Sequence, residues 1–362
     1  MDPLWLALAF LLGLLARHLG LPALVGYLAT GFALNGLGAQ SSELLDQVAH
    51  AGVLLLLFGV GLKLRLKSLI RPEVWGASGL HLIVSAAVLG SGLWAIATLP
   101  VGQSLLLAAT LGFSSTVLAA KVLEDKVELR AFHGRLAIGI LVIQDLAALA
   151  LMALAGAATP TPWVLLVLGL PLLRPLVAKV LEWSGHDELL VLYGLALALV
   201  VGGLGFEHLG LSSELGALLL GALLAGHPRA MELSRSLWSL KEVLLVGFFL
   251  QIGLMGWPSL ESLGWALLLV SLLPYKAALF FLILVKFRLR ARTAFLTALA
   301  LASYSEFALI VVKFLVGSGQ LQADWLVLLA LAVALSFVAA APLNRFAHGL
   351  YERLETWLAR FE

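Results

Sequence analysis

The sequence contains no cysteine, and only 12% of its 362 residues are charged. The first absence excludes disulfides, thiol catalysis and cysteine-based zinc sites. The second excludes an ordinary soluble domain, in which about 25% of the residues carry charge. Hydrophobic residues make up 62% of the chain and the mean hydropathy is +1.05. This composition predicts a membrane protein with no room for a sizeable soluble domain.

Long apolar runs recur along the whole chain and predict an all-α membrane protein with thirteen transmembrane helices. The first run begins at Leu4 without a basic segment before it or a small-residue cleavage site after it, so we expect a span rather than a signal peptide. The expected helices cover residues 3–16, 21–36, 44–62, 73–98, 104–123, 135–156, 162–182, 187–206, 212–226, 238–257, 263–285, 293–315 and 325–347.

Lysine and arginine are missing from every second connection between these helices. The connections NGLGAQSSELLD, ATPTP, EHLGLSSE and GSGQLQAD contain neither residue. All but Lys276 and Lys313 of the 23 basic residues lie in or beside the other connections and in the C-terminal tail. By the positive-inside rule we expect the N-terminus outside and the C-terminus in the cytoplasm, in a plasma membrane or a bacterial inner membrane.

Twelve of the expected helices divide into two sets of six, joined by helix 7. The extra helix inverts the second set relative to the first, and such inverted repeats are typical of secondary transporters. We expect helices 1–3 and 8–10 to form a panel with a dimer contact, and helices 4–6 and 11–13 to form a moving core. These units cover residues 1–62 (panel), 73–156 (core), 162–185 (linker helix 7), 187–257 (panel), 263–347 (core) and 348–362 (cytoplasmic tail).

Helices 5 and 12, the fifth helix of each set, carry polar clusters near their middles. Ser114, Ser115 and Thr116 interrupt the first, and residues 303–306 (Ser-Tyr-Ser-Glu) interrupt the second. Hydroxyl groups can satisfy backbone groups where a helix unwinds in a membrane. One such cluster alone favours hydroxyl bonds to the preceding turn or helix–helix contacts over an unwound helix. The matching positions favour two discontinuous crossover helices.

Three ionisable residues lie close to the centres of apolar runs: Asp145 in helix 6, Lys276 in helix 11 and Glu306 in helix 12. A charge at the centre of a bilayer costs about 2.5–3.5 kcal/mol on insertion scales, so we expect these residues to be functional. The alternative for Asp145 and Lys276 is a structural ion pair, a poor stabiliser because desolvation can exceed the Coulombic attraction. Glu306 is expected to neutralise the positive end of a half-helix rather than to bind an ion directly.

Patterns for metal, nucleotide or catalytic sites are also missing. The eight histidines include no HExxH motif or paired ligand spacing. The glycines at 59–61 and 202–205 do not follow strands, so they are not nucleotide fingerprints. His81 is the histidine nearest to the middle of a run and has no partners for a Ser/His/Asp arrangement. We therefore expect no enzyme, no bound cofactor and no nucleic-acid partner.

The segment GFSSTVLAAKVLEDKVELRAFHGRLAIGILVIQDLAAL (112–149) resembles the monovalent cation:proton antiporter-2 family, in particular Kef-type potassium/proton antiporters. Members carry a Ser-Ser-Thr break in helix 5, a His-Gly-Arg loop and a Gln-Asp pair, which correspond here to residues 114–116, 133–135 and 144–145. Further similar segments extend the resemblance over nearly the whole chain: LPALVGYLATG (21–31), LLLLFGVGLKL (54–64), LGALLLGALLAG (215–226), GFFLQIGLM (247–255) and SEFAL (305–309).

The resemblance implies a sodium/proton-antiporter-like fold and a monovalent-cation site. Asp145 corresponds to the carboxylate that binds the cation and the proton in turn, and Gln144 is its neighbour. Ser114, Ser115 and Thr116 correspond to the crossover segment that lines the site, so Asp145, Thr116 and Ser115 are the expected cation ligands. Transported K⁺ or Na⁺ and H⁺ are the only ions implied.

The resemblance also gives Lys276 and Glu306 roles in coupling and charge compensation. Lys276 corresponds to a lysine of electrogenic members, and Glu306 to the acidic residue of the second crossover. Two departures stand out. Tyr304 and Ser305 replace small residues, often Gly-Gly, which leaves the shape of the second break open. Kef-type proteins also continue into a nucleotide-binding regulatory domain, whereas the tail after residue 347 is expected to be an amphipathic helix or the start of a connection.

The function expected from these features and from the resemblance is the exchange of a monovalent cation for protons by alternating access, with K⁺ preferred because of the Kef-type resemblance and of Gln144 beside Asp145. Proton and cation would compete for Asp145. The alternatives are a ligand-gated potassium efflux system that works as a channel, which would need a continuous pathway, and a Na⁺/H⁺ antiporter. Lys276 would either pair with Asp145 and release a second proton, or remain a counter-ion of Asp145 or of a half-helix and give one-for-one exchange.

Overall fold

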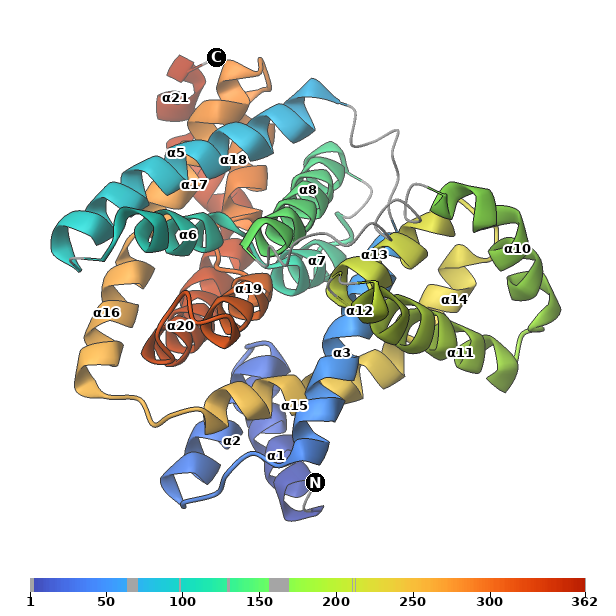
Figure 1. Ribbon diagram of the computed structural model, residues 1–362. Coiled ribbons are helices and arrows are strands. Elements are labelled where there is room, and N and C mark those ends of the chain that lie inside the picture. Colours follow the sequence, from blue (N-terminus) through green and yellow to red (C-terminus); the bar gives the residue numbers. More distant parts are fainter. Residues whose placement is uncertain are drawn as a thin grey trace.

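The computed structural model describes residues 3–63, 71–97, 99–128, 131–155, 169–209, 211 and 213–361. All regular elements in these ranges are helices (Figure 1). The first half of the chain contains α1 (Pro3–His18), α2 (Ala23–Gly36), α3 (Glu43–Leu62), α5 (Pro72–Ile96), α6 (Val101–Gly112), α7 (Thr116–Asp125), α8 (Phe132–Ala155) and α10 (Leu170–Trp183). The second half contains α11 (Glu188–Leu195), the π-helix η2 (Ala196–Leu204), α12 (Gly205–His208), α13 (Ser213–Leu223), α14 (Ala230–Ser236), α15 (Trp238–Leu254), α16 (Leu260–Ser271), α17 (Leu273–Lys286), α18 (Ala291–Ala300), α19 (Glu306–Gly317), α20 (Asp324–Arg345), α21 (Ala347–Leu358) and the 3₁₀ turn η3 (Ala359–Phe361).

The length and composition of these helices fit a membrane protein. Within the described ranges, six helices are long and apolar enough to cross a bilayer, or up to seven if the bent pair α14–α15 is one span. Four shorter apolar helices, α1, α2, α6 and α13, accompany them. The expected all-helical membrane architecture is therefore confirmed, and the count of thirteen spans stays a prediction.

The helix boundaries differ from the predicted ones mainly where the chain carries polar residues or glycine. Predicted helix 8 contains the π-helix η2, and predicted helix 10 is preceded by α14, which is bent by 50° against α15. The short α14 is tied to the end of α10, because Arg229 donates to the carbonyl of Leu181 at 2.7 Å and pairs with Glu232 at 3.0 Å. The first part of predicted helix 7, residues 162–168, lies outside the described residues.

Two groups of helices can be distinguished by their packing. The glycine-packed group consists of α2, α3, η2, α13 and α15, which contact one another closely. The broken-helix group consists of α5, α6, α7, α8, α17, α18 and α19. In Figure 1, α2, α3 and α15 lie together in the lower part of the view, and α5, α6, α8, α17 and α18 lie in its upper left part. Helix α20 contacts members of both groups.

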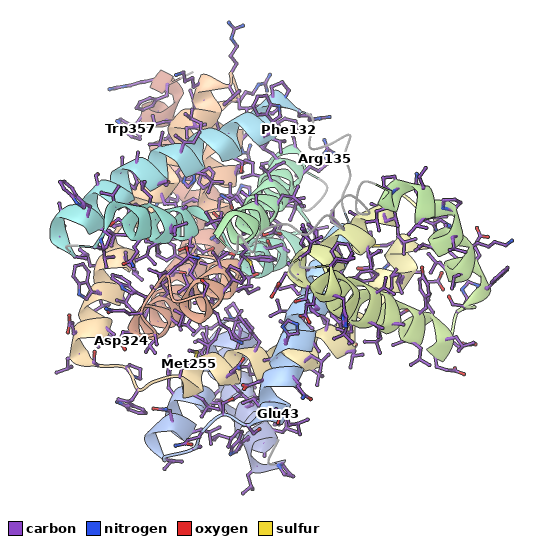
Figure 2. The ribbon with its side chains drawn as sticks, in the orientation of Figure 1. Glu43, Phe132, Arg135, Met255, Asp324 and Trp357 are labelled. Atoms are coloured by element: carbon purple, nitrogen blue, oxygen red, sulfur yellow. The ribbon has the colours of Figure 1, made fainter. Side chains whose placement is uncertain are left out.

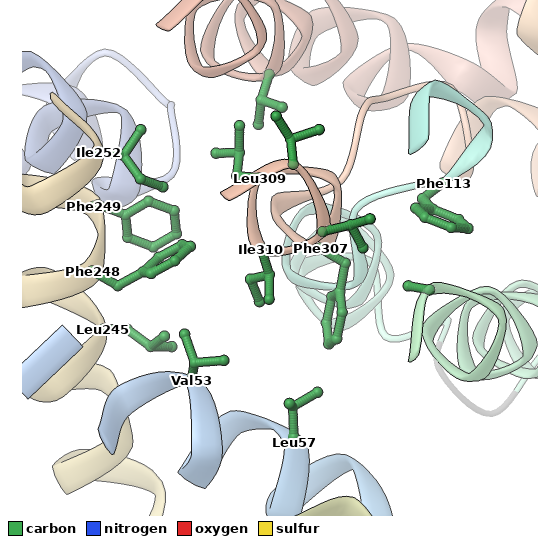
Figure 3. Packing of buried hydrophobic residues seen from close by; sticks show 14 of the residues in the cluster. Val53, Leu57, Phe113, Leu245, Phe248, Phe249, Ile252, Phe307, Leu309 and Ile310 are labelled. Atoms are coloured by element: carbon green, nitrogen blue, oxygen red, sulfur yellow. The ribbon is translucent and has the colours of Figure 1, made fainter. Parts of the chain in front are cut away.

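Apolar side chains fill the interface between the two groups. Val53 and Leu57 of α3 and Phe248 of α15 face Phe307 and Ile310 of α19 (Figure 3). All five side chains belong to one buried cluster. This interface therefore consists of interlocking side chains.

Helix ends that the loop pattern predicts on the same side of the membrane also lie together. The lower half of Figure 2 contains Glu43, Met255 and Asp324, and its upper half contains Phe132, Arg135 and Trp357. The first three residues follow or precede connections without basic residues, and the other three flank basic ones. The fold thus agrees with the sorting of charge that the sequence shows.

Candidate functional site

Two helices are interrupted at the polar clusters that the sequence analysis selected. Helix α6 ends at Gly112 and α7 begins at Thr116, and α18 ends at Ala300 and α19 begins at Glu306. Each interruption leaves helix-terminal N–H and C=O groups inside the apolar interior, where they need partners. Side chains from other helices provide these partners, and they define the site.

Gln144 of α8 holds the first break together. Its Oε1 accepts a hydrogen bond from the backbone N–H of Ser114 at 2.9 Å, and its Nε2 donates to the carbonyl of Gly112 at 3.2 Å. The side-chain amide therefore replaces helical hydrogen bonds on both sides of Phe113. This position is compatible with the expectation that Gln144 neighbours the ion site. Both ends of its amide are nevertheless bonded to backbone groups of the first break.

Lys276 of α17 joins the C-terminal ends of the interrupted half-helices. Its ammonium group donates to the carbonyls of Leu111 at 3.2 Å, Phe113 at 2.5 Å and Ser303 at 2.9 Å. An ammonium group has three donors, so all of them are used here. Because helix C-termini carry partial negative charge, the buried lysine compensates both breaks at once.

Glu306 and Ser115 join the N-terminal ends of α19 and α7. The Ser115 hydroxyl donates to Glu306 Oε2 at 2.8 Å and accepts from the N–H of Leu118 at 3.1 Å. Ser305 caps α19 by accepting from the N–H of Phe307 at 3.0 Å. Glu306 therefore lies where partial positive charge accumulates, which is the position the sequence analysis expected for it.

Asp145 lies next to Gln144 on α8 and is only 2% exposed. Thr116, the first residue of α7, donates its hydroxyl to Asp145 Oδ2 at 3.4 Å, a long hydrogen bond. Among the described residues no ion pair joins Asp145 to Lys276, whose donors are directed at carbonyl groups. The carboxylate of Asp145 is thus buried beside the first break with the hydroxyl of Thr116 as its polar partner.

Ser336 is a further residue of the site that was not predicted from the sequence, and Tyr304 makes contacts there that were not predicted. Ser336 of α20 accepts from the N–H of Tyr304 at 3.0 Å and so supports the second break. Tyr304 itself is buried, donates to the carbonyl of Leu269 at 2.6 Å, and places its ring 5.1 Å from the Lys276 ammonium. A single serine within the apolar run of α20 was the available signal.

A cavity leads to this site from one end of the interface between the two groups. It has a volume of about 90 Å³, enough for several water molecules. Its lining runs from Pro22, Lys241 and Glu242 at the beginnings of α2 and α15 to Glu306 and Ile310 on α19. Since Glu306 is bonded to the crossover residue Ser115, the cavity reaches the paired half-helices.

The donor set suits a monovalent cation better than a transition metal. The described residues contain no group of three His, Cys, Asp or Glu side chains that could hold a metal ion. Asp145 and Thr116 instead offer hard oxygen donors, the type that alkali cations bind. His81 does not take part, because it is buried and stacks on Phe280 with ring centroids 3.6 Å apart.

Two interrupted helices that meet beside a buried carboxylate, in a helical membrane protein, define a secondary transporter. Comparison with known sequences leads to the same class of protein. The chain matches the transmembrane model of the sodium/hydrogen exchangers over residues 6–345, and it belongs to this family. Its resemblance to Kef-type cation:proton antiporters is confirmed, and the family consists of transporters rather than enzymes.

Two individual proteins illustrate the relationship. The chain is 31% identical, over an alignment of 374 positions, to the glutathione-regulated potassium-efflux system protein KefC of Salmonella heidelberg. The alignment includes 94% of this chain and 58% of KefC, so the chain spans little more than half of that relative. The structure of the sodium proton antiporter MjNhaP1 from Methanocaldococcus jannaschii, at pH 8, has the same fold, with a TM-score of 0.68 at 17% identity over 95% of this chain and 96% of that one.

Proposed function

We propose that the protein exchanges a monovalent cation for protons and that Asp145 binds each in turn. The observation that carries this proposal is the position of Asp145, buried beside a helix break with Thr116 as its partner and with no ion pair to Lys276. A deprotonated carboxylate can hold a partly dehydrated cation, and a protonated one cannot. Competition for one carboxylate couples the two fluxes in opposite directions.

The proposed cycle moves the broken-helix group against the glycine-packed group. In this scheme the two groups correspond to the core and the panel of two inverted six-helix repeats, with thirteen spans and with α6–α7 and α18–α19 as crossover helices. The cavity beside Lys241 would then open towards the cytoplasm, because the loops on that side carry the basic residues. A homodimer through the panel helices and a regulatory domain outside this chain complete the proposal.

The bonds of Lys276 support one-for-one exchange. A lysine whose three donors serve the carbonyls of Leu111, Phe113 and Ser303 compensates two half-helix ends. It has no donor left for a pair with Asp145 that cation binding would break. We therefore propose that Lys276 stays charged through the cycle and that exchange is electroneutral.

K⁺ is the proposed cation because the relative at 31% identity is named a potassium-efflux system. Gln144 supports this less directly, since both ends of its amide are bonded to the backbone of the first break. Titration of K⁺ against Na⁺ in proteoliposomes with an internal pH dye measures the preference. Half-maximal proton movement at a lower Na⁺ than K⁺ concentration would refute the assignment of K⁺.

The replacement Asp145→Asn tests the shared site. It should abolish cation-driven proton movement in the same proteoliposomes and leave expression and thermal stability intact, because it removes a buried charge. Asp324→Asn, at the exposed start of α20, is the matched control and should exchange normally. Normal exchange by Asp145→Asn would overturn the proposal.

A further inference from the structure

Polar side chains link α3, α15 and α19 at the end of the interface away from the cavity. Lys313 of α19 donates from Nζ to Oε1 of Gln251 on α15. Nε2 of Gln251 donates to Oδ1 of Asp46, near the start of α3. Ser41 also donates to Oδ1 of Asp46, at 2.6 Å. Gln251 is only 8% exposed, so the amide that joins the two charged residues is buried. We call Asp46, Gln251 and Lys313 the polar latch.

The register of all three helices places the polar latch at the opposite end from the cavity. On α19, Lys313 lies about 10 Å beyond the cavity residue Glu306 and about 5 Å beyond Ile310, the last cavity residue of this helix. On α3, Asp46 lies about 15 Å before the cavity residue Leu56. On α15, Gln251 follows the last of the cavity-lining residues of that helix. The interface is therefore hollow at one end and bridged at the other.

The ring of Phe248 separates the two ends. It lines the cavity, and its centroid lies 5.5 Å from the ammonium group of Lys313. A cation over an aromatic face is attracted to the ring. Figure 3 shows Phe248 and its neighbour Phe249 directed towards the side chains of α19. Phe248 thus forms part of the cavity wall and also contacts the ammonium group of the polar latch.

We propose that the polar latch closes the path to Asp145 at this end and that it opens each time the transporter exposes Asp145 there. The inference rests on the proposed function, in which α19 moves against α3 and α15. Lys313 belongs to the broken-helix group, which moves in this scheme, and Gln251 and Asp46 belong to the glycine-packed group. The movement must break the bond from Lys313 to Gln251, and Lys313 is in this sense a positioning residue.

The expected effect of removing the polar latch follows from the type of bond. A hydrogen bond from a charged donor contributes more than a neutral one. Its loss should favour the state that is open at the latch by about tenfold, the ratio that corresponds to about 1.4 kcal/mol. This factor applies to the ratio of the latch-open state to the cavity state, so the population of the cavity state should fall as that of the latch-open state rises. The two ends of the interface should therefore change accessibility in opposite directions.

Single cysteines in this cysteine-free chain can measure both ends. Val53→Cys places a thiol in the buried interface between the polar latch and the cavity, and Leu56→Cys places one in the cavity wall on the same helix. The full chain in detergent is treated with a water-soluble maleimide, and the labelling rates are compared with and without Lys313→Met. The rate should rise several-fold at position 53 and fall about twofold or more at position 56.

Matched variants distinguish opening of the polar latch from a general loosening of the fold. Gln251→Met cuts the same chain of bonds, so it should reproduce the opposite changes, and the double variant should add little to them. Lys286→Met, at the exposed end of α17, should leave both rates unchanged. Faster labelling at both positions, or unchanged labelling at both, would overturn the proposal. Labelling needs no ion gradient, so its result is independent of the Asp145→Asn exchange test.

Discussion

The interfaces within the glycine-packed group and the interface towards α19 are built on different principles. A Cβ atom on Gly61 of α3 would lie 2.4 Å from the carbonyl oxygen of Leu218 on α13, and one on Gly221 would lie 2.2 Å from that of Phe58. The helices here meet backbone to backbone, as membrane helices with small residues do. The interface with α19 consists of side chains such as Phe249 and Ile310.

The same close approach recurs elsewhere in the glycine-packed group. A Cβ atom on Gly31 of α2 would lie 2.5 Å from the carbonyl oxygen of Leu250 on α15, and one on Gly216 of α13 would lie 2.0 Å from that of Gly202 in η2. Backbones in contact cannot slide without separating, whereas side chains can exchange rotamers as they move. We therefore expect the first kind of interface to behave as a rigid body and the second to allow motion.

The largest effect is expected at Lys276, which bonds backbone carbonyls at both breaks of the broken-helix group. Lys276→Gln removes a buried charge and most of its bonds to Leu111, Phe113 and Ser303. Carbonyls at two half-helix ends then lose their partner, which should cost about 3–5 kcal/mol of unfolding free energy. Thermal unfolding in detergent measures this, with the exposed Lys286→Gln as the control. A stability equal to that of the control would show that Lys276 does not hold the breaks.

Much of this site was predictable, because polar residues in an apolar run are conspicuous. Asp145, Lys276, Glu306 and the cluster 114–116 were selected for that reason, and the cluster 114–116 and residues 303–306 lie between the ends of consecutive helices, α6 and α7 in one case and α18 and α19 in the other. The partners of these residues were not predictable. The pattern tells which residue types enter the membrane, and only the fold decides that Lys276 meets carbonyls from two distant segments.

The bonding partners within the polar latch were likewise not predictable from the sequence. Lys313 was recognised as one of two lysines inside helices, but its partner Gln251 belongs to another helix and is a neutral side chain.

The π-helix η2 was also missed, because the run around it is uniformly apolar and has no period that would reveal an extra residue per turn. Gly202 of this π-helix lies against Gly216 of α13, a tertiary contact that the sequence pattern does not reveal.

An intermediate effect is expected at the glycine contacts, and α3 offers a matched pair. Gly61→Ala inserts a methyl group against the backbone of α13, whereas Gly59→Ala points into open space. The first should lower the unfolding free energy by about 1–3 kcal/mol through overpacking. The second should be neutral or stabilising by about 1 kcal/mol, because alanine favours a helix. Thermal unfolding of both variants measures the difference, and equal stabilities would remove the basis of the comparison.

A smaller effect is expected in the side-chain interface. Ile310→Leu conserves volume in the buried contact between α19 and α15, so it should cost less than about 1.5 kcal/mol. Exchange in proteoliposomes should stay within about twofold of the unmodified protein, since repacked side chains can still slide. If this conservative change stopped transport, the interface would need exact complementarity. The contrast with the glycine contacts would then fail.

The smallest effect is expected at an ionic contact, which differs both from the glycine contacts and from the apolar side-chain interface. Glu128, in the loop between α7 and α8, has its Oε2 3.1 Å from Nε2 of His133 and its Oε1 2.6 Å from Nε2 of His348 on α21. Partial burial raises the pKa of Glu128, but the hydrogen bonds and charges of the two histidines outweigh this and leave the pKa below its usual value. The carboxylate therefore attaches the C-terminal helix α21 to the end of a half-helix.

The sign of the pH dependence follows from this lowered pKa. A depressed pKa in the folded state stabilises the protein at every pH above the unfolded value, about 4.3, and the contribution disappears as the pH falls through the folded value. Glu128→Gln should therefore lower the unfolding free energy at pH 7 by about 1 kcal/mol or less, as expected for a partly exposed ion pair. Thermal unfolding of both proteins between pH 7 and pH 3.5 measures the difference, which should shrink only at the acid end. A difference that stays constant over this range would mean that the Glu128 side chain packs against α21 without acting through its charge.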